Sequence, residues 1–118
     1  MLFKLYKKYT SFRYIKKNLV QLKYILSIEK KSVLFGCDIY SNFIEDININ
    51  EGDNKNNILK IPNKKDTVIG SHALLLIGFD ENNGFIVSNS WKCGDNGVHF
   101  ISFNYVMSKL CFDFMTLI

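Results

Sequence analysis

The chain has 118 residues, of which 47% are hydrophobic and 22% charged, and its formal net charge is +4. This length indicates one domain, and the apolar fraction excludes a wholly disordered chain. One proline and seven glycines exclude collagen-like and low-complexity classes, and no apolar run reaches the roughly 18 residues of a membrane-spanning helix.

The N-terminal quarter is strongly basic. Residues 1–31 have a net charge of +8, whereas the remainder has −4. An amphipathic helix is predicted over Ser11–Glu29, with Ser11 as its N-cap. Its apolar face is formed by residues spaced four, three and four positions apart: Ile15, Leu19, Leu22 and Leu26. Residues 1–13 are interpreted as a basic extension of a single domain spanning 1–118. The positive charge is either a solvated helix face or a surface for nucleic acid or an anionic membrane.

The remaining segments favour strands separated by turns. Ser32–Tyr40 is a short apolar run that predicts a buried strand. Ser41–Thr67 is rich in Asn, Asp and Lys and predicts a long surface loop with a short strand at Ile58–Ile61. Further elements are predicted in this order: strands at His72–Asp80, Gly84–Ser90 and Val98–Phe103, a short helix at Tyr105–Lys109 and a strand at Cys111–Leu117. One helix followed by mostly antiparallel strands indicates an α+β domain with a curved sheet or partial barrel.

The cysteines and histidines show no pattern of a metal site. The chain has three cysteines at irregular spacing: Cys37, Cys93 and Cys111. Their odd number argues against a disulfide framework and favours a reducing compartment. Together with His72 and His99, the cysteines lack the short paired spacings of a zinc site. Residues 46–57 begin like a calcium loop, but the glycine comes one residue late and Asn57 takes the position of the glutamate that binds calcium. We expect no metal and no cofactor. The sequence contains no secretory signal, so its location is unknown, with the cytosol as the default expectation.

The predicted hairpin carries the residues best suited to chemistry. His72 begins one strand and Asn89 lies at the end of the next, so the hairpin can bring both to one rim. An imidazole can take a proton from a nucleophile while a neighbouring amide oxygen fixes its tautomer. Trp91 could cover that bond and keep water from it. Taken alone, a histidine at the start of a strand is more often structural.

The wider context resembles the papain-like cysteine peptidases (C1 type). The segments GSHALLLIGFD, NGFIVSNSW and GDNGVHFISFNYV match, in order, the region of that family that carries its His and Asn. LFGCDIYSNF and CFDFMTLI resemble flanking strands of the same family, so the likeness covers residues 14–118. It implies the β-rich, C-terminal half of a two-domain enzyme, with the substrate cleft between the halves.

By this resemblance, His72 matches the catalytic general base and Asn89 the residue that orients it. Trp91 matches the indole that shields their contact, and Gly70 and Ser71 would form part of the wall near the substrate cleft. Three positions depart from the family pattern and put the shape of the cleft wall in doubt: Lys92 for glycine, Ser102 for proline and Met115 for tryptophan.

The larger departure concerns the nucleophile. In papain-like enzymes the catalytic cysteine precedes the histidine by roughly 130–150 residues, whereas only 71 residues precede His72. That cysteine would therefore lie upstream of Met1. Cys37 and Cys111 fall in predicted strands, where free cysteine usually packs as a small apolar residue. Cys93, in a turn near Trp91, is only a remote candidate because no helix N-terminus is predicted there to lower its pKa.

Three functions stay open from the sequence. The first is the general-base half of a cysteine peptidase that acts on peptide or protein substrates. This half would be inactive alone, because the cysteine would be on another polypeptide of a split enzyme or on a truncated part of the gene. The second is a pseudoenzyme that binds a protein, which could be a peptidase half, a peptidase that it inhibits, or a second copy of itself. The third and weakest is a basic helix that binds nucleic acid. A membrane partner is not expected.

Overall fold

The computed structural model describes residues 11–47, 57–90 and 97–117. Its helices are α2 (Leu19–Ser27), α3 (Asn42–Asp46) and α4 (Phe103–Met107). Its strands are β1 (Phe12–Tyr14), β2 (Val33–Tyr40), β3 (Ile58–Leu59), β4 (Val68–Asp80), β5 (Gly84–Ser88), β6 (Val98–Ile101) and β7 (Cys111–Leu117). None of the helices in these described parts is long and apolar enough to cross a membrane.

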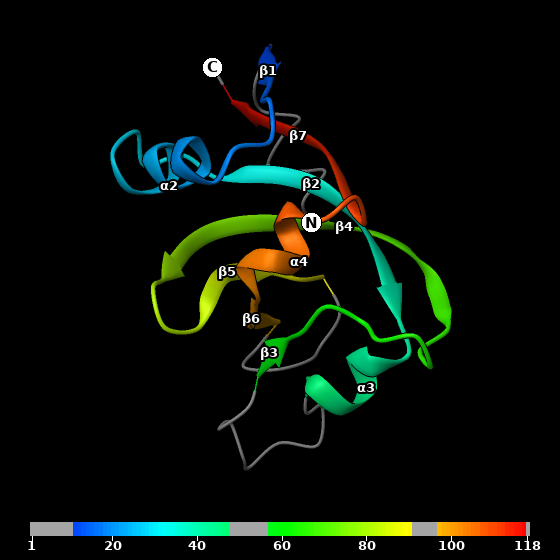
Figure 1. Ribbon diagram of the computed structural model, residues 1–118. Helices are drawn as coiled ribbons and strands as arrows, with labels where there is room; N and C mark the ends of the chain where they lie inside the picture. The colour runs from blue at the N-terminus through cyan, green and yellow to red at the C-terminus, as the bar shows by residue number, and fades with distance from the viewer. Residues whose placement is uncertain (1–10, 48–56, 91–96, 118) are drawn as a thin grey trace.

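All of these strands join one strongly twisted sheet (Figure 1). Their order is β1-β7-β2-β4-β5-β6-β3, and each pair is antiparallel except β3 with β6. The described strands do not close into a barrel, because β1 and β3 form the two edges. The prediction of an α+β domain with a curved, mostly antiparallel sheet is confirmed.

The predicted helix over Ser11–Glu29 is wrong in its first half. Residues 12–14 form β1, which pairs with β7, because aromatic side chains favour a pleated surface when a partner strand is available. The helix begins only after Asn18, whose side chain accepts a hydrogen bond from the Gln21 backbone N–H at 3.0 Å. Asn18, and not Ser11, is therefore the N-cap.

The other predicted elements are present with shifted ends. The segment 41–67 contains the short helix α3 as well as the expected strand at β3, which is two residues long. Strand β4 starts at Val68, four residues before the predicted start, because that part of the chain pairs with β2. Strands β5 and β6 are shorter than predicted, and α4 starts two residues earlier.

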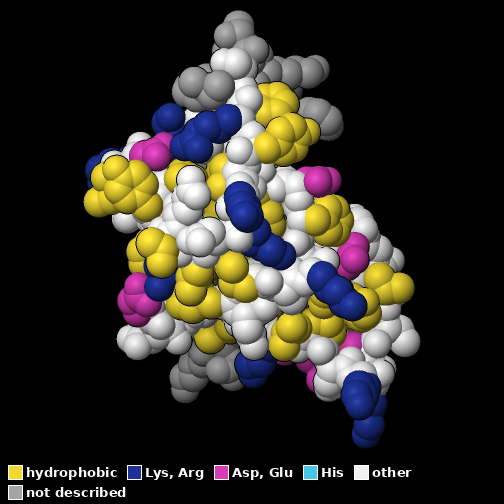
Figure 2. Space-filling view, turned by 45° about the horizontal axis from the view of Figure 1, so that its top comes forward, with side chains coloured by type: hydrophobic (Ala, Val, Ile, Leu, Met, Phe, Trp, Pro, Cys, Tyr) yellow, Lys and Arg dark blue, Asp and Glu magenta, His cyan; other side chains and the backbone are white. Residues whose placement is uncertain are grey.

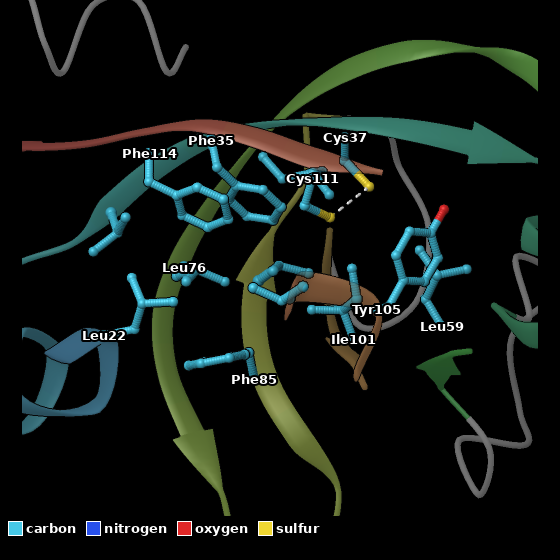
Figure 3. Packing of buried hydrophobic residues seen from close by; sticks show 14 of the residues in the cluster. Leu22, Phe35, Cys37, Leu59, Leu76, Phe85, Ile101, Tyr105, Cys111 and Phe114 are labelled. Atoms are coloured by element: carbon cyan, nitrogen blue, oxygen red, sulfur yellow. Dashed lines mark hydrogen bonds between the residues drawn. The ribbon is translucent and has the colours of Figure 1, made fainter. Parts of the chain in front are cut away.

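The hydrophobic core lies on one face of the sheet, beneath α2 and α4 (Figure 3). Leu22 of α2 and Leu76 of β4 are both fully buried there. The rings of Phe35 and Phe114 stack with centroids 5.1 Å apart. Tyr105 of α4 is buried too, and its hydroxyl donates to the backbone oxygen of Asp38 on β2 at 2.5 Å. These contacts join α2 to β4, β2 to β7 and α4 to β2, and so hold the strands around the predicted site.

Candidate functional site

The β4–β5 hairpin sets the relative position of the predicted site residues. Its turn is fixed by Asp80, whose carboxylate accepts from the Asn82 backbone N–H at 3.0 Å and from the Asn83 amide at 2.9 Å. Gly84 closes the turn with φ of +111°, a backbone conformation that favours glycine. The turn pairs Asp80 with Gly84 and Gly78 with Ile86.

A β-bulge at Ile77 then shifts the pairing by one residue. Beyond it Leu76 pairs with Val87 and Leu75 with Ser88. Since side chains alternate between faces along a strand, this shift places Asn89 on the same face of the sheet as His72. Without the bulge, Asn89 would face the opposite side. The sequence could not fix this register, and a one-residue bulge decides it.

His72 and Asn89 are joined directly. Nε2 of His72 lies 2.8 Å from Oδ1 of Asn89. The imidazole is partly exposed, whereas Asn89 is buried with 6% of its surface accessible. The Asn89 backbone N–H donates to the oxygen of Gly97 at 2.7 Å, which ties the end of β5 to the start of β6. The structure therefore brings together the two residues that the sequence predicts as a base and its orienting amide.

A second histidine completes a chain of hydrogen bonds. Nε2 of His99, on β6, lies 3.2 Å from Nδ2 of Asn89, and its Nδ1 lies 2.9 Å from the backbone oxygen of Phe100. Burial lowers the pKa of His99; the nearby His72 also lowers it, against an opposing contribution from the Phe100 carbonyl. His99 is therefore a neutral imidazole at neutral pH.

Sequence reasoning considered His99 only as a metal ligand and missed this contact. The available signal was its place in the strand sequence Val98-His99-Phe100-Ile101, where His99 and Ile101 share a face. A polar ring on the core-facing side needs a buried hydrogen-bond partner, and Asn89 on the preceding strand offers one.

Gly70 and Ser71 lie just before His72 on β4 and are both exposed. The Ser71 hydroxyl donates to Oδ1 of Asp38, its partner across β2, at 2.7 Å. A Cβ built on Gly70 would meet no atom within 4 Å. The space beside Gly70 is thus open, and its place near a substrate cleft stays a prediction.

The cysteines do not supply an exposed thiol within the described residues. Cys37 lies directly opposite His72 in the β2–β4 pairing, yet it is fully buried. The Cys111 thiol donates to the sulfur of Cys37 at 3.4 Å (Figure 3). This bond and burial raise the pKa of Cys111, so it is a protonated thiol and a poor nucleophile. Trp91, Lys92 and Cys93 lie outside the described residues.

The arrangement can hold and move one proton. With Nε2–H donated to Asn89, Nδ1 of His72 is the atom with a lone pair that can take a proton from a thiol. Within the described parts of the chain, no group of three or more His, Cys, Asp or Glu residues lies close enough together to hold a metal ion.

Two known proteins resemble this chain in sequence or in structure. No protein-family model matches the chain. It is 34% identical over 81 residues to an uncharacterized peptidase C1-like protein of Acanthamoeba polyphaga mimivirus, a match covering 65% of this chain and 24% of the relative. Its structure matches xylellain, a cysteine protease from Xylella fastidiosa, with a TM-score of 0.75 and 25% identity, over 92% of this chain and 40% of xylellain.

The chain thus spans about a quarter of the viral relative and two fifths of xylellain. The names of both proteins point to the same family that the ordered series of motifs in the sequence resembles. In sequence and in fold, the chain resembles the papain-like (C1) cysteine peptidases.

Proposed function

We propose that this chain is the general-base half of a papain-like cysteine peptidase. His72 takes the proton of a cysteine thiol, and Asn89 holds the imidazole in the tautomer that allows it. The thiolate then attacks the peptide carbonyl, a thioester forms as the amine leaves with a proton from His72, and water releases the acyl group. The observation that best supports this proposal is the 2.8 Å contact between Nε2 of His72 and Oδ1 of Asn89.

The nucleophile in this proposal comes from outside the 118 residues. Cys37 and Cys111 are buried free thiols joined by a hydrogen bond, so neither can reach a peptide at the exposed side of His72. Another polypeptide, or a longer form of the protein, would supply the cysteine. The isolated chain is then expected to cleave no peptide. Cleavage by the pure chain that disappears in His72→Ala would contradict this requirement.

A chimera tests the function directly. The part of xylellain that this chain matches, 40% of its length, is replaced by the present chain, so that the remaining part supplies the cysteine. We expect hydrolysis of a fluorogenic peptide, and a loss of roughly 10²–10⁴-fold in kcat/KM on His72→Ala, the usual contribution of general acid–base catalysis.

Ala73→Ser is the matched control. Ala73 is exposed and adjoins His72, but its side chain lies on the other face of the strand, so the activity of this variant should equal that of the unmodified chimera. A folded chimera with a titratable thiol and no His72-dependent hydrolysis would overturn the proposal.

A second candidate function is a non-catalytic, protein-binding module. It is favoured by two large apolar side chains beside Gly70: Val68 is 60% exposed and Ile69 is 53% exposed. Exposed apolar surface of this kind often marks a protein interface. The partner would be the missing peptidase half, an intact peptidase or a second copy of the chain.

Self-association can be measured by sedimentation equilibrium. For a module that binds itself, the apparent mass rises with concentration, and the paired substitution Val68→Ser and Ile69→Ser abolishes that rise. A monomer at every concentration, together with an active chimera, would favour the peptidase half.

Binding of nucleic acid receives less support. Several cations of the basic segment are engaged within the described residues. Arg13 pairs with Glu29 at 3.1 Å, and Lys23 pairs with Glu81 at 2.9 Å. Lys17 donates to two backbone oxygens, including that of Cys111 at 2.8 Å. On the face in Figure 2, the Lys and Arg side chains of the described residues lie in separate groups.

A further inference from the structure

His99 is held in a fixed position behind the His72–Asn89 pair. It lies on β6 opposite Val87 of β5, and 2% of its surface is exposed. Phe43 of α3 contacts its ring edge to face, with centroids 5.8 Å apart and planes at 82°. A ring packed in this way presents its two nitrogen atoms in set directions, one toward the backbone of β6 and one toward Asn89.

The first of those contacts fixes the proton on His99. A carbonyl oxygen only accepts hydrogen bonds, so Nδ1 at 2.9 Å from the Phe100 oxygen must carry the hydrogen. Burial lowers the pKa of His99 and keeps the ring neutral near pH 7. In a neutral imidazole with the proton on Nδ1, Nε2 has a lone pair and acts as an acceptor.

The second contact fixes the amide of Asn89. Only Nδ2 can donate to the lone pair of His99 Nε2, and these atoms lie 3.2 Å apart. Oδ1 must then point the other way, toward Nε2 of His72 at 2.8 Å. A reversed amide would set its oxygen against the His99 lone pair. It would also require His72 to carry its proton on Nδ1.

We propose that His99 is a positioning residue that sets the orientation of the Asn89 amide and, through it, the Nε2–H tautomer of His72. The relay starts at the Phe100 carbonyl and ends at the Nε2–H of His72, so that the lone pair of this imidazole is on Nδ1. The role of that Nδ1 as a catalytic base rests on the proposed function, whereas the relay itself does not. A merely structural His99 would fill space beneath Phe43 and leave the tautomer unaffected.

Nitrogen-15 NMR of the labelled, unmodified chain tests the relay without any substitution. We expect a scalar coupling between Nδ2 of Asn89 and Nε2 of His99 across their hydrogen bond. Long-range proton–nitrogen correlations should show His99 with its proton on Nδ1 and His72 with its proton on Nε2. Resolved signals with no coupling, or His72 protonated on Nδ1, would overturn the proposal.

Two substitutions separate positioning from packing. His99→Phe keeps a ring beneath Phe43 but removes both hydrogen bonds, so the Nδ1–H form of His72 should rise about fivefold, as expected for one lost bond of about 1 kcal/mol. His99→Gln keeps an amide that can donate to the Phe100 oxygen and accept from Asn89, so it should restore the distribution toward that of the wild type. Equal His72 tautomer populations in the wild type and a folded His99→Phe would overturn the proposal.

The two proposals fail separately. An inactive chimera in which the coupling and the His72 tautomer are intact would overturn the peptidase function but leave the relay in place. An active chimera whose kcat is unchanged by His99→Phe, with the His72 tautomer also unchanged, would overturn the relay alone.

Discussion

Two segments of strand β4 differ in burial: residues 74–76, called here the buried half, and residues 68–71, called the exposed half. Residues 74–76 are buried, with Leu74 and Leu76 fully inaccessible, and they pair with β2 on one side. Leu75 and Leu76 pair with β5 on the other side. Val68, Gly70 and Ser71 also pair with β2, but residues 68–71 are all exposed. His72 lies at the boundary, partly exposed and bonded to Asn89.

This difference separates the residues that hold the sheet together from those that carry the candidate chemistry. The buried half packs against α2 and pairs with β2 and β5, whereas the exposed half pairs with β2. A substitution in the buried half should therefore reduce stability. A substitution at the boundary should change the hydrogen bonds of His72, and one in the exposed half should change neither.

The largest effect is expected in the buried half. Leu76→Ala should lower the free energy of unfolding by roughly 2–5 kcal/mol, because it removes apolar contacts and leaves a cavity. Urea denaturation measures this change. Ile77→Ala is the matched control, since Ile77 is the next residue but is 43% exposed, and it should cost less. Equal losses for the two variants would contradict the expectation that burial decides how much a residue of β4 contributes to stability.

At the boundary, Asn89 and His99 should behave as a coupled pair. Asn89→Leu leaves Nε2 of buried His99 without its donor and should cost about 1–3 kcal/mol of stability. His99→Phe should cost a similar amount, because it removes the hydrogen bonds of His99 to Nδ2 of Asn89 and to the Phe100 oxygen. The double variant should cost less than the two single losses together, by about 0.5–3 kcal/mol. Additive losses in urea denaturation would contradict the coupling.

The pH dependence of stability follows from the pKa of His99, which burial lowers below its ordinary value of 6.5. The groups that face it are His72, which also lowers the pKa, the Phe100 carbonyl, which raises it, and the uncharged Asn89 and Phe43. Below pH 6.5, His99 of the unfolded chain binds a proton more readily than His99 of the folded chain. The contribution of His99 to the free energy of unfolding is therefore full above pH 6.5. It decreases as the pH falls, by at most about 1.4 kcal/mol per pH unit.

Comparing wild type with His99→Phe isolates this contribution. The difference between their unfolding free energies, measured by denaturation from pH 7.5 to 5, should shrink as the pH falls. A difference that is constant over this interval would mean that His99 titrates alike in the folded and unfolded chains.

Much of the fold could be predicted because hydrophobic patterns and turn residues are local. The strands from Ser32 onward and the hairpin at Glu81–Gly84 follow from such patterns, whereas the choice of His72 and Asn89 depends on the resemblance to a family. The N-terminal error has a different cause. The helical period starts only at Ile15, and the predicted helix extends it back to Ser11, whereas residues 12–14 pair with β7 at the far end of the chain. Local periodicity carries no information about that partner.

The site was only partly predictable for the same reason. The likeness of Asn89-Ser90-Trp91 to a family motif identified Asn89, whereas the bulge at Ile77 that turns it toward His72 depends on pairing across two strands. The role of His99 required three strands to be in register, since it meets Asn89 only after β4, β5 and β6 have aligned. Register of this kind arises from packing and lies outside what a single sequence pattern specifies.

The smallest change in stability is expected in the exposed half, at Gly70. No atom lies within 4 Å of a Cβ built there, so Gly70→Ala should leave the free energy of unfolding within about 0.5 kcal/mol of wild type or raise it slightly. Gly84→Ala is the contrasting control, because its Cβ would lie 2.4 Å from the backbone oxygen of Ile101 at φ of +111°, and it should be clearly destabilising. If Gly70 borders a substrate cleft, its added methyl group should lower kcat/KM of the chimera while stability is unchanged. An unchanged kcat/KM would place the cleft away from the exposed half of β4 and limit the candidate site to His72, Asn89 and His99.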